Sequence, residues 1–388
     1  AGGAARYTDL AIADAADTGG PASLTTGTVL WPESFNDYNI YTLYGEPAEG
    51  ARRINVTIVP DGYTYAEKSL MKSHADGLVS YLRSKTPYKE HDPFINYTLV
   101  YAYSLESGTD QCDCGIIRDT AMGTTFLPNG DPCGGSANRC LYYNGACDTQ
   151  SESNIVAAEL RAPVHDTTII MVNTARYGGC GGQRAVYSAG NGSATEVAVH
   201  ELGHSLAGLA DEYVSYSGCG WYAGEINTST NGVAGAWSEW IPELGLPRVG
   251  AQYWSSCLFR PFDNCEMRSL AQPFCPVCNQ HWALSIFGHP RVGPTAPVES
   301  SYPPGSASAC QGVPATFSIE TRLPAGAVAG NVIDWTLSGP GFPQPTQVAT
   351  GVASHTRTFT QTGSYVLTAG VIADAGFVKP VRYGANRD

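Results

Sequence analysis

The chain has 388 residues, of which 43% are hydrophobic and 10% aromatic, so it can form two or three globular domains with ample core. Its formal net charge of −13 at pH 7 argues against nucleic acid and anionic membranes as partners, because both would repel an acidic surface. No apolar run approaches the length of a transmembrane helix, so no membrane span is predicted.

The first part of the chain predicts the strands and helices of an α/β layer. Residues 54–58 alternate between apolar and polar side chains, which is typical of a strand. Thr64 and Glu67 have the spacing of a capping box, so a helix is predicted from there to about Arg83. Further strands are predicted at residues 97–103 and 167–172. This order of elements favours a mixed α/β domain.

The most informative motif is His-Glu-Leu-Gly-His at residues 200–204. Two histidines four positions apart lie on one face of a helix, so His200 and His204 could bind one zinc ion. Glu201 could then deprotonate a water activated by that metal, as a general base. The alternative interpretation is an amphipathic helix whose histidines and glutamate merely face solvent.

Local signals place this motif in a helix. Ser193 and Glu196 predict a second capping box at its start, and Gly208 is a plausible stop. Because a glycine turn lets the chain double back, an acidic residue soon after Gly208 could face the two histidines.

A catalytic zinc site needs a third protein ligand and an open fourth position. Asp211 is the predicted third ligand, because its short side chain suits a ligand fixed by a tight turn. Glu212 is the rival within the same turn. A second alternative is a glutamate from later in the chain, and the candidates are Glu225, Glu239, Glu243 and Glu266.

Two long segments flank this motif. Residues 105–165 form a cysteine-rich insert, which we expect to shape a cleft wall. Residues 214–262 are rich in Gly, Trp and Tyr, and they either shape part of the substrate site or form the core of a loop-rich subdomain. A closing helix is predicted at residues 278–287.

The C-terminal part of the chain differs in composition and in its predicted elements. Residues 292–307 are rich in Pro, Ser and Gly and predict a linker. Short strands separated by Gly and Pro turns follow, and they predict an immunoglobulin-like β-sandwich. Trp335 is expected to be buried in it, and Tyr365 to open one of its strands. The sandwich could bind substrate, contact a surface or a glycan, or only brace the rest of the chain.

The 12 cysteines suit six disulfides in an oxidising compartment, and so indicate a secreted protein. All except Cys310 lie between Cys112 and Cys278, so complete pairing would require a bridge from Cys310 to that region. The alternative interpretation is a second metal site, and the candidate ligands are Cys257, Cys265, Cys275 and Cys278.

The stretch HELGHSLAGLADEY at residues 200–213 resembles the active-site segment of the IgA-peptidase family of zinc metallopeptidases, which have a metzincin-like catalytic domain. Shorter segments resemble other parts of that family, namely residues 59–64, 104–110, 177–182 and 264–268. The resemblance covers about residues 50–290. The usual third metzincin histidine is replaced here by Ala210, so the third ligand has to be an acid one position later.

The resemblance implies particular roles for site residues. It implies that His200, His204 and Asp211 are zinc ligands and that Glu201 is the general base. It also favours a methionine-containing turn at Met267 beneath the zinc, over the alternative that this side chain only fills a gap in the core.

The predicted fold class is α/β (α+β), a metzincin-like zinc peptidase domain followed by an immunoglobulin-like β-sandwich. The predicted parts are an N-terminal extension or small β segment (1–50), the catalytic domain with disulfide-rich inserts (51–291), a linker (292–307) and the sandwich (308–388). The predicted function is a secreted zinc metalloendopeptidase acting on protein or peptide substrates. Two alternatives are a secreted binding or adhesin protein with a structural or decayed metal site, and a zinc hydrolase acting on a non-peptide amide.

Overall fold

The computed structural model describes residues 28–126, 139–143, 151–222, 224–232, 237–289, 298–325 and 332–372. Its largest element is a six-stranded sheet of order β2-β4-β3-β8-β10-β9. The four inner strands β4, β3, β8 and β10 are parallel, whereas the two edge strands β2 and β9 are antiparallel to their neighbours. In sheet order the strands are Ile40–Tyr44, Ile95–Val100, Ile54–Asp61, Thr167–Val172, Ala185–Ser188 and Gly179–Cys180. The predicted mixed α/β class is therefore confirmed.

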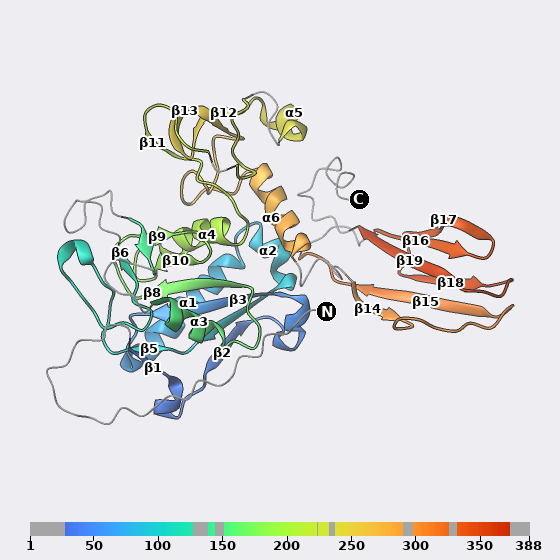
Figure 1. The fold of residues 1–388 in the computed structure, drawn as a ribbon, viewed down its shortest axis with the longest axis horizontal. Helices are drawn as coiled ribbons and strands as arrows, with labels where there is room; N and C mark the ends of the chain where they lie inside the picture. Colours follow the sequence, from blue (N-terminus) through green and yellow to red (C-terminus); the bar gives the residue numbers. More distant parts are fainter. Residues whose placement is uncertain are drawn as a thin grey trace, which may run out of the picture.

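Helices cover both faces of this sheet (Figure 1). Helices α1 (Lys68–Leu82) and α4 (Ala194–Ser205) pack on the face to which Ile54 and Val56 point. Helix α3 (Ser151–Glu159) packs on the opposite face. The alternating residues Ile54, Val56 and Ile58 of β3 therefore all belong to one core, and Val59 belongs to the core on the opposite face.

The two predicted capping boxes have different outcomes. Thr64 and Glu67 form the box, and a single 3-10 turn then leads into α1. Ser193 precedes α4 but makes no side-chain capping bond, so the second prediction was wrong. The reason is that the Glu196 carboxylate turns toward the end of α1, where it accepts hydrogen bonds from Tyr81 of the helix and from Lys85, which follows it.

Short elements surround the main sheet. Strand β1 (Val29–Leu30) pairs with β5 (Tyr103–Ser104), so part of the predicted N-terminal β segment does pack on the main domain. Residues 1–27 of that segment lie outside the described residues. Within the cysteine-rich insert, the described residues include the small sheet of β6 (Thr125–Phe126) and β7 (Leu141–Tyr142).

A smaller subdomain lies above α4 in Figure 1. It contains a sheet of order β11-β13-β12, and the strands are Val214–Tyr216, Tyr253–Arg260 and Arg248–Ala251. The remaining α-helices of the described residues are α2 (Tyr88–His91), α5 (Ile241–Leu244) and α6 (Pro276–Gly288). Trp237 and Trp240 are buried, which favours the interpretation of the aromatic segment as subdomain core, whereas Trp221 is exposed.

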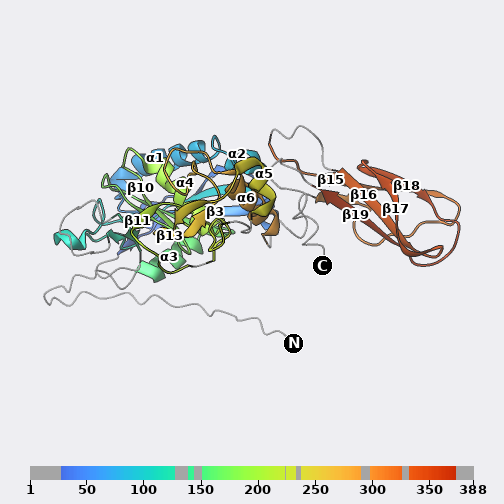
Figure 2. The same cartoon turned by 90° about the horizontal axis from the view of Figure 1, so that it is seen from above.

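The C-terminal part has two three-stranded sheets that extend away from the main body (Figure 2). One consists of β14 (Val298–Tyr302), β15 (Pro314–Thr321) and β18 (Ser354–Thr358), and the other of β17 (Phe342–Thr350), β16 (Val332–Gly339) and β19 (Val366–Ile372). Trp335 is buried between them, as expected. Tyr365 directly precedes β19, and its hydroxyl donates to the Gln361 carbonyl at 3.1 Å. An immunoglobulin-like topology stays a prediction.

The C-terminal sheets are joined to the main body by charged side chains. Residues 298–302, predicted to be part of the linker, instead form strand β14, which carries Glu299. Buried Arg53 donates to Glu46 and Glu299, each at 3.0 Å. Arg322 donates to the same two carboxylates at 2.8 and 2.9 Å. Among the helices of the described residues, none is long and apolar enough to cross a bilayer.

Candidate active site

Helix α4 carries His200, Glu201 and His204 and lies between the main sheet and the smaller subdomain (Figure 1). The Nε2 atoms of the two histidines lie 3.2 Å apart, because residues four positions apart are stacked on one helix face. His200 and Glu201 are less than one tenth exposed. The interpretation of this helix as a solvent-facing amphipathic helix is therefore wrong.

The chain after α4 brings Asp211 to the two histidines. Gly208 has a φ of +62°, a left-handed conformation that glycine adopts without strain, and the chain reverses there. Asp211 Oδ1 lies 2.9 Å from His200 Nε2 and 3.4 Å from His204 Nε2. Three ligands of one tetrahedral zinc ion would be separated by about 3.3 Å, given metal–ligand bonds of about 2.0–2.1 Å. The three atoms thus have the spacing that a shared zinc ion requires.

The outer nitrogen of each imidazole is held by the main chain. His200 Nδ1 donates to the carbonyl oxygen of Glu266 at 3.0 Å, and His204 Nδ1 donates to that of Leu209 at 2.6 Å. A carbonyl oxygen only accepts hydrogen bonds, so the proton of each neutral imidazole lies on Nδ1. Each Nε2 donates to Asp211 when the imidazole is protonated, and in the neutral form it would turn a lone pair toward the same point, which is the orientation of a metal-ligating histidine.

Four of the alternative third ligands, Glu212, Glu225, Glu239 and Glu266, have carboxylates that contact groups other than the two histidines. Glu212 points away from the histidines, and its Oε1 is 3.4 Å from Cys278 Sγ. Glu225 accepts a hydrogen bond from Gln252, and Glu239 accepts one from Gln280. Glu266 supplies only its backbone carbonyl to His200, while its carboxylate lies 3.6 Å from Lys85 Nζ.

The charges of the site favour a cation between the histidines. Burial alone would lower the pKa of His200, but hydrogen bonding to Asp211 and the charge of Glu201 raise it to about 10. Burial alone would raise the pKa of Asp211, but hydrogen bonds from His200 and His204 lower it below its usual range. Burial raises the pKa of the Glu201 carboxyl. A bound metal ion would supply the positive charge that the protons on the two histidines otherwise supply.

A glycine-rich segment packs directly on α4. A Cβ atom added at Gly179 would lie 2.7 Å from Glu201 Oε1, and one at Gly181 would lie 2.5 Å from His204 Cβ. This segment resembles the family segment noted above, and its glycines let the edge strand β9 approach the helix. The Gly179 amide donates to the Arg139 carbonyl at 3.0 Å, so this part of the sheet edge is already paired.

Met267 lies beneath α4 in a tight turn. The Arg268 amide donates to the Cys265 carbonyl at 2.9 Å, which closes the turn. Met267 is fully buried, and a Cβ atom at Gly203 would lie 2.6 Å from its Sδ. The side chain therefore packs against α4 at Gly203, between His200 and His204 in the chain, and its role beneath a zinc ion stays a prediction.

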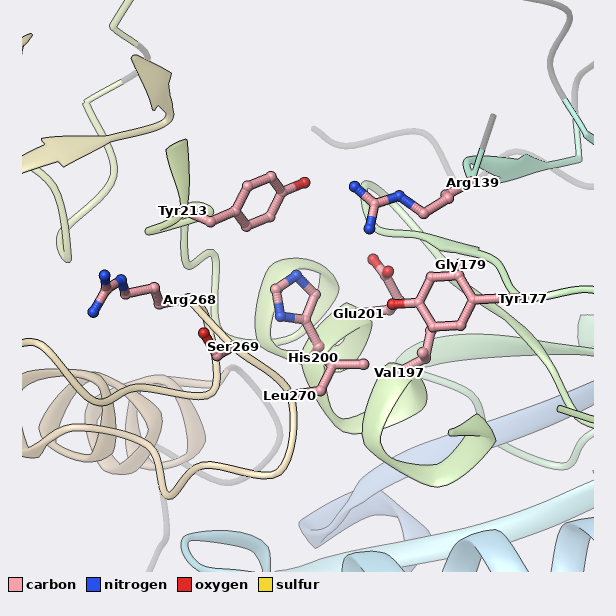
Figure 3. Close-up of a pocket in the computed structure, with 10 residues that line it drawn as sticks. All are labelled: Arg139, Tyr177, Gly179, Val197, His200, Glu201, Tyr213, Arg268, Ser269 and Leu270. Atoms are coloured by element: carbon pink, nitrogen blue, oxygen red, sulfur yellow. The ribbon is translucent and has the colours of Figure 1, made fainter. Parts of the chain in front are cut away.

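A cleft opens on both sides of Glu201. One half, of about 350 Å³, is lined by Arg139, Tyr177, Tyr213 and Leu270 together with His200 and Glu201 (Figure 3). The other half is lined by Gly181, Asp211 and Tyr253. The Tyr253 hydroxyl donates to Asp211 Oδ2. Sequence reasoning missed Arg139 and the cleft role of Arg268, although Arg268 lies in the segment that resembles the family turn.

The cysteines depart from the prediction of six disulfides. Disulfides join Cys140 to Cys180 and Cys219 to Cys257, and Cys112 is also disulfide-bonded. The first bridge fixes the strand next to Arg139 to the edge strand β9. Three cysteines are buried with free thiols, namely Cys265, Cys275 and Cys278. Cys310 is exposed and unbridged, so the expected link from Cys310 to the catalytic region was wrong.

A mixed α/β domain with a buried His-Glu-x-x-His helix and a converging aspartate has the architecture of a metallopeptidase. Residues 45–234 match the model of the family described as IgA Peptidase M64, and through this region the chain belongs to that family of metallopeptidases. The matched region contains α4 and Asp211 and ends before the Met267 turn. A comparison of the chain with curated proteins finds no match.

Proposed function

We propose that the protein is a secreted zinc-dependent endopeptidase that hydrolyses peptide bonds in protein substrates. One observation carries the proposal: His200 Nε2, His204 Nε2 and Asp211 Oδ1 lie 2.9–3.4 Å from one another, beside a cleft that Glu201 also lines. Two imidazoles and one carboxylate are a ligand set of catalytic zinc sites, which leave a further position open to substrate and water.

Each residue has a distinct role in this proposal. His200, His204 and Asp211 would hold the zinc ion, which when bound would polarise the scissile carbonyl and make water a stronger nucleophile. Glu201 accepts a proton from the attacking water and passes it to the leaving amine. Because Glu201 lies in the cleft between its two halves, its carboxylate can reach water on one side and the leaving group on the other.

The cleft suits an extended peptide. It runs between the glycine-rich segment, residues 177–182, and the side chains of Tyr213 and Tyr253. A substrate chain lying there would pass over Glu201 with side chains directed toward Arg139 on one side (Figure 3). The Tyr213 hydroxyl extends over the cleft and is our candidate for stabilising the oxyanion of the tetrahedral intermediate.

Secretion is part of the proposal because of the disulfides. Bridges such as Cys140–Cys180 and Cys219–Cys257 form and persist in oxidising compartments. The first bridge also lies at the cleft wall, so reduction should weaken the site as well as the fold.

The test is digestion of a mixed peptide library with the unmutated protein and with Glu201→Gln, read by mass spectrometry. We expect cleavage only by the unmutated protein and equal zinc content in both, because Glu201 is not a ligand in this proposal. An unmutated protein with full zinc that cuts neither peptides nor folded proteins would contradict it. A panel of non-peptide amides would then test the hydrolase alternative, and loss of zinc with unfolding in Glu201→Gln would favour a binding protein with a structural metal.

A further inference from the structure

A second cluster of metal-ligand side chains lies behind the candidate active site. It consists of Glu212, Cys265, Cys275 and Cys278, whose ligand atoms all lie within 4.8 Å of one another. All four residues are buried. Glu212 follows Asp211 in the chain, Cys265 precedes the Met267 turn, and Cys275 and Cys278 lie at the start of α6. Two stretches far apart in sequence, at residue 212 and at residues 265–278, therefore converge on one point.

The distances fit tetrahedral coordination and do not fit a disulfide. Cys265 Sγ lies 3.6 Å from Cys278 Sγ, and Cys278 Sγ lies 3.4 Å from Glu212 Oε1. Zinc bonds of about 2.3 Å to sulfur and about 2.0 Å to oxygen would separate two sulfurs by about 3.8 Å, and a sulfur from an oxygen by about 3.5 Å. A disulfide would require about 2.05 Å. Three cysteines, moreover, cannot all be paired within this cluster.

One oxygen of the buried Glu212 carboxylate lacks a partner. Its Oε1 accepts a hydrogen bond from Asn227 Nδ2 at 3.0 Å. Its Oε2 is buried and has no hydrogen-bond partner in the described part of the chain. A buried polar oxygen without a partner is costly, and more so when it carries charge. A cation bound beside the three sulfurs would remove that cost.

We propose that Glu212, Cys265, Cys275 and Cys278 bind a structural zinc ion, separate from the candidate catalytic metal. Three thiolates and one carboxylate complete a tetrahedral shell, which leaves no open position for substrate. Binding replaces the three thiol protons, which pass to solvent, by three sulfur–zinc bonds. Cys257, a candidate ligand in the sequence analysis, is bridged to Cys219, and Glu212 takes the fourth position.

The ion would brace the active site. The Glu212 amide donates to the Met267 carbonyl at 2.7 Å, so the loop that carries Asp211 is already joined to the Met267 turn. The next residue after Cys265 is Glu266, whose carbonyl orients His200. A metal bond from Glu212 and one from Cys265 would fix both segments to α6. The existence of this second site does not depend on whether the chain cleaves peptides.

The test counts metal in the purified protein and in three variants by inductively coupled plasma mass spectrometry. We expect two zinc ions per chain in the unmutated protein and in Cys310→Ser, a matched control for loss of an exposed cysteine. We expect one in Cys278→Ser and one in His204→Ala. The two single-site variants should retain different ions, and cobalt can distinguish them.

Cobalt substitution separates the sites, because only the second one contains thiolates. The unmutated protein and His204→Ala should show thiolate-to-cobalt charge-transfer absorption, and Cys278→Ser should lose it. The measurement on the unmutated protein remains decisive if a variant fails to fold. The proposal would be overturned by a single zinc per unmutated chain whose cobalt form lacks that absorption, or by a mass showing two of the three cysteines joined in a disulfide.

Discussion

The carboxylates of Asp211 and Glu212 point into two different clusters, although the residues are neighbours in the chain. Asp211 contacts both active-site histidines, whereas Glu212 contacts Cys278. Backbone bonds hold the pair in this arrangement: Gln252 donates to the Asp211 carbonyl at 2.9 Å, and Glu212 donates to Met267. The two acids can therefore be tested separately.

Asp211→Ala should abolish peptidase activity and weaken metal binding at the active site by more than about a hundredfold, since even the partners of ligands contribute about 10–100-fold. The measurement is a competitive zinc titration followed by a peptide cleavage assay. Glu225→Ala is the control, because Glu225 lines the same cleft but bonds to Gln252. Unchanged zinc affinity in Asp211→Ala would exclude this residue as a ligand.

Tyr253→Phe and Tyr213→Phe should have different effects. Tyr253 donates to Asp211, so its loss should lower zinc affinity about 10–100-fold. Tyr213→Phe should leave zinc affinity unchanged and lower kcat by about 10²–10³-fold if its hydroxyl stabilises the oxyanion. Zinc titration and steady-state kinetics on the same preparations distinguish the two roles. Equal effects of the two variants on metal affinity would refute the assignment.

Gly181→Ala should damage the site more than Gly182→Ala. A Cβ atom added at Gly181 would lie 2.5 Å from both Cβ and Cδ2 of His204. None of the described atoms lies within 4 Å of a Cβ atom added at Gly182. Overpacking of this kind costs about 1–3 kcal/mol. We expect a lower free energy of unfolding and reduced activity for Gly181→Ala only, measured by denaturant titration and peptide cleavage. Matching losses in both variants would point to a backbone effect instead.

Met267→Leu should be tolerated and Met267→Ala should not. Truncation of a fully buried methionine costs about 2–5 kcal/mol, whereas a swap that conserves volume usually costs less than about 1.5 kcal/mol. Because Met267 packs on Gly203, which lies between His200 and His204 in the chain, the alanine variant should also lose activity before it unfolds. Thermal unfolding and activity, measured over the same temperatures, would show this order. Coincident loss of both would favour a purely structural methionine.

Glu159→Gln should destabilise the protein at neutral pH and matter less in acid. Burial alone would raise the pKa of Glu159, but hydrogen bonds from Arg184 and Thr168 leave the pKa below its usual value. A carboxyl with a lowered folded pKa stabilises the fold above its unfolded pKa, and this contribution is lost as the pH falls through the folded pKa. Breaking a buried pair costs about 3–5 kcal/mol, which sets an upper range for this substitution.

The control for that experiment is Glu152→Gln, since Glu152 bonds the same arginine at 3.0 Å but is half-exposed. Exposed ion pairs contribute about 0–1 kcal/mol. Urea unfolding at several pH values would measure both variants. A destabilisation by Glu159→Gln that stayed constant from neutral to acid pH would contradict the assigned role.

The active-site helix was predictable because its signal is local. The spacing of His200 and His204 places both on one face of a helix, and Gly208 predicts the turn that follows it. The choice between Asp211 and Glu212 was harder, because two adjacent acids differ only in the direction they face. That direction is set by backbone bonds to Met267 and Gln252, which no local pattern encodes.

Long-range contacts account for what sequence reasoning missed. Glu196 has the spacing of a capping residue, yet Lys85, which follows α1, lies close enough to bind it. Arg139 enters the cleft because a disulfide at the next residue, Cys140, joins its segment to β9. The count of cysteines could not separate bridged residues from the three buried thiols, because both kinds occur in the same stretch of chain.

The histidines of α4 are oriented by peptide carbonyls of Glu266 and Leu209 rather than by side chains. Replacement of the side chain at either position leaves the carbonyl in place. The imidazole tautomer is therefore protected against most point mutations and is exposed to changes that move the main chain. Variants of the loops at 205–211 and 265–269, by insertion or deletion, should consequently disturb metal binding more than any side-chain exchange at Glu266 or Leu209.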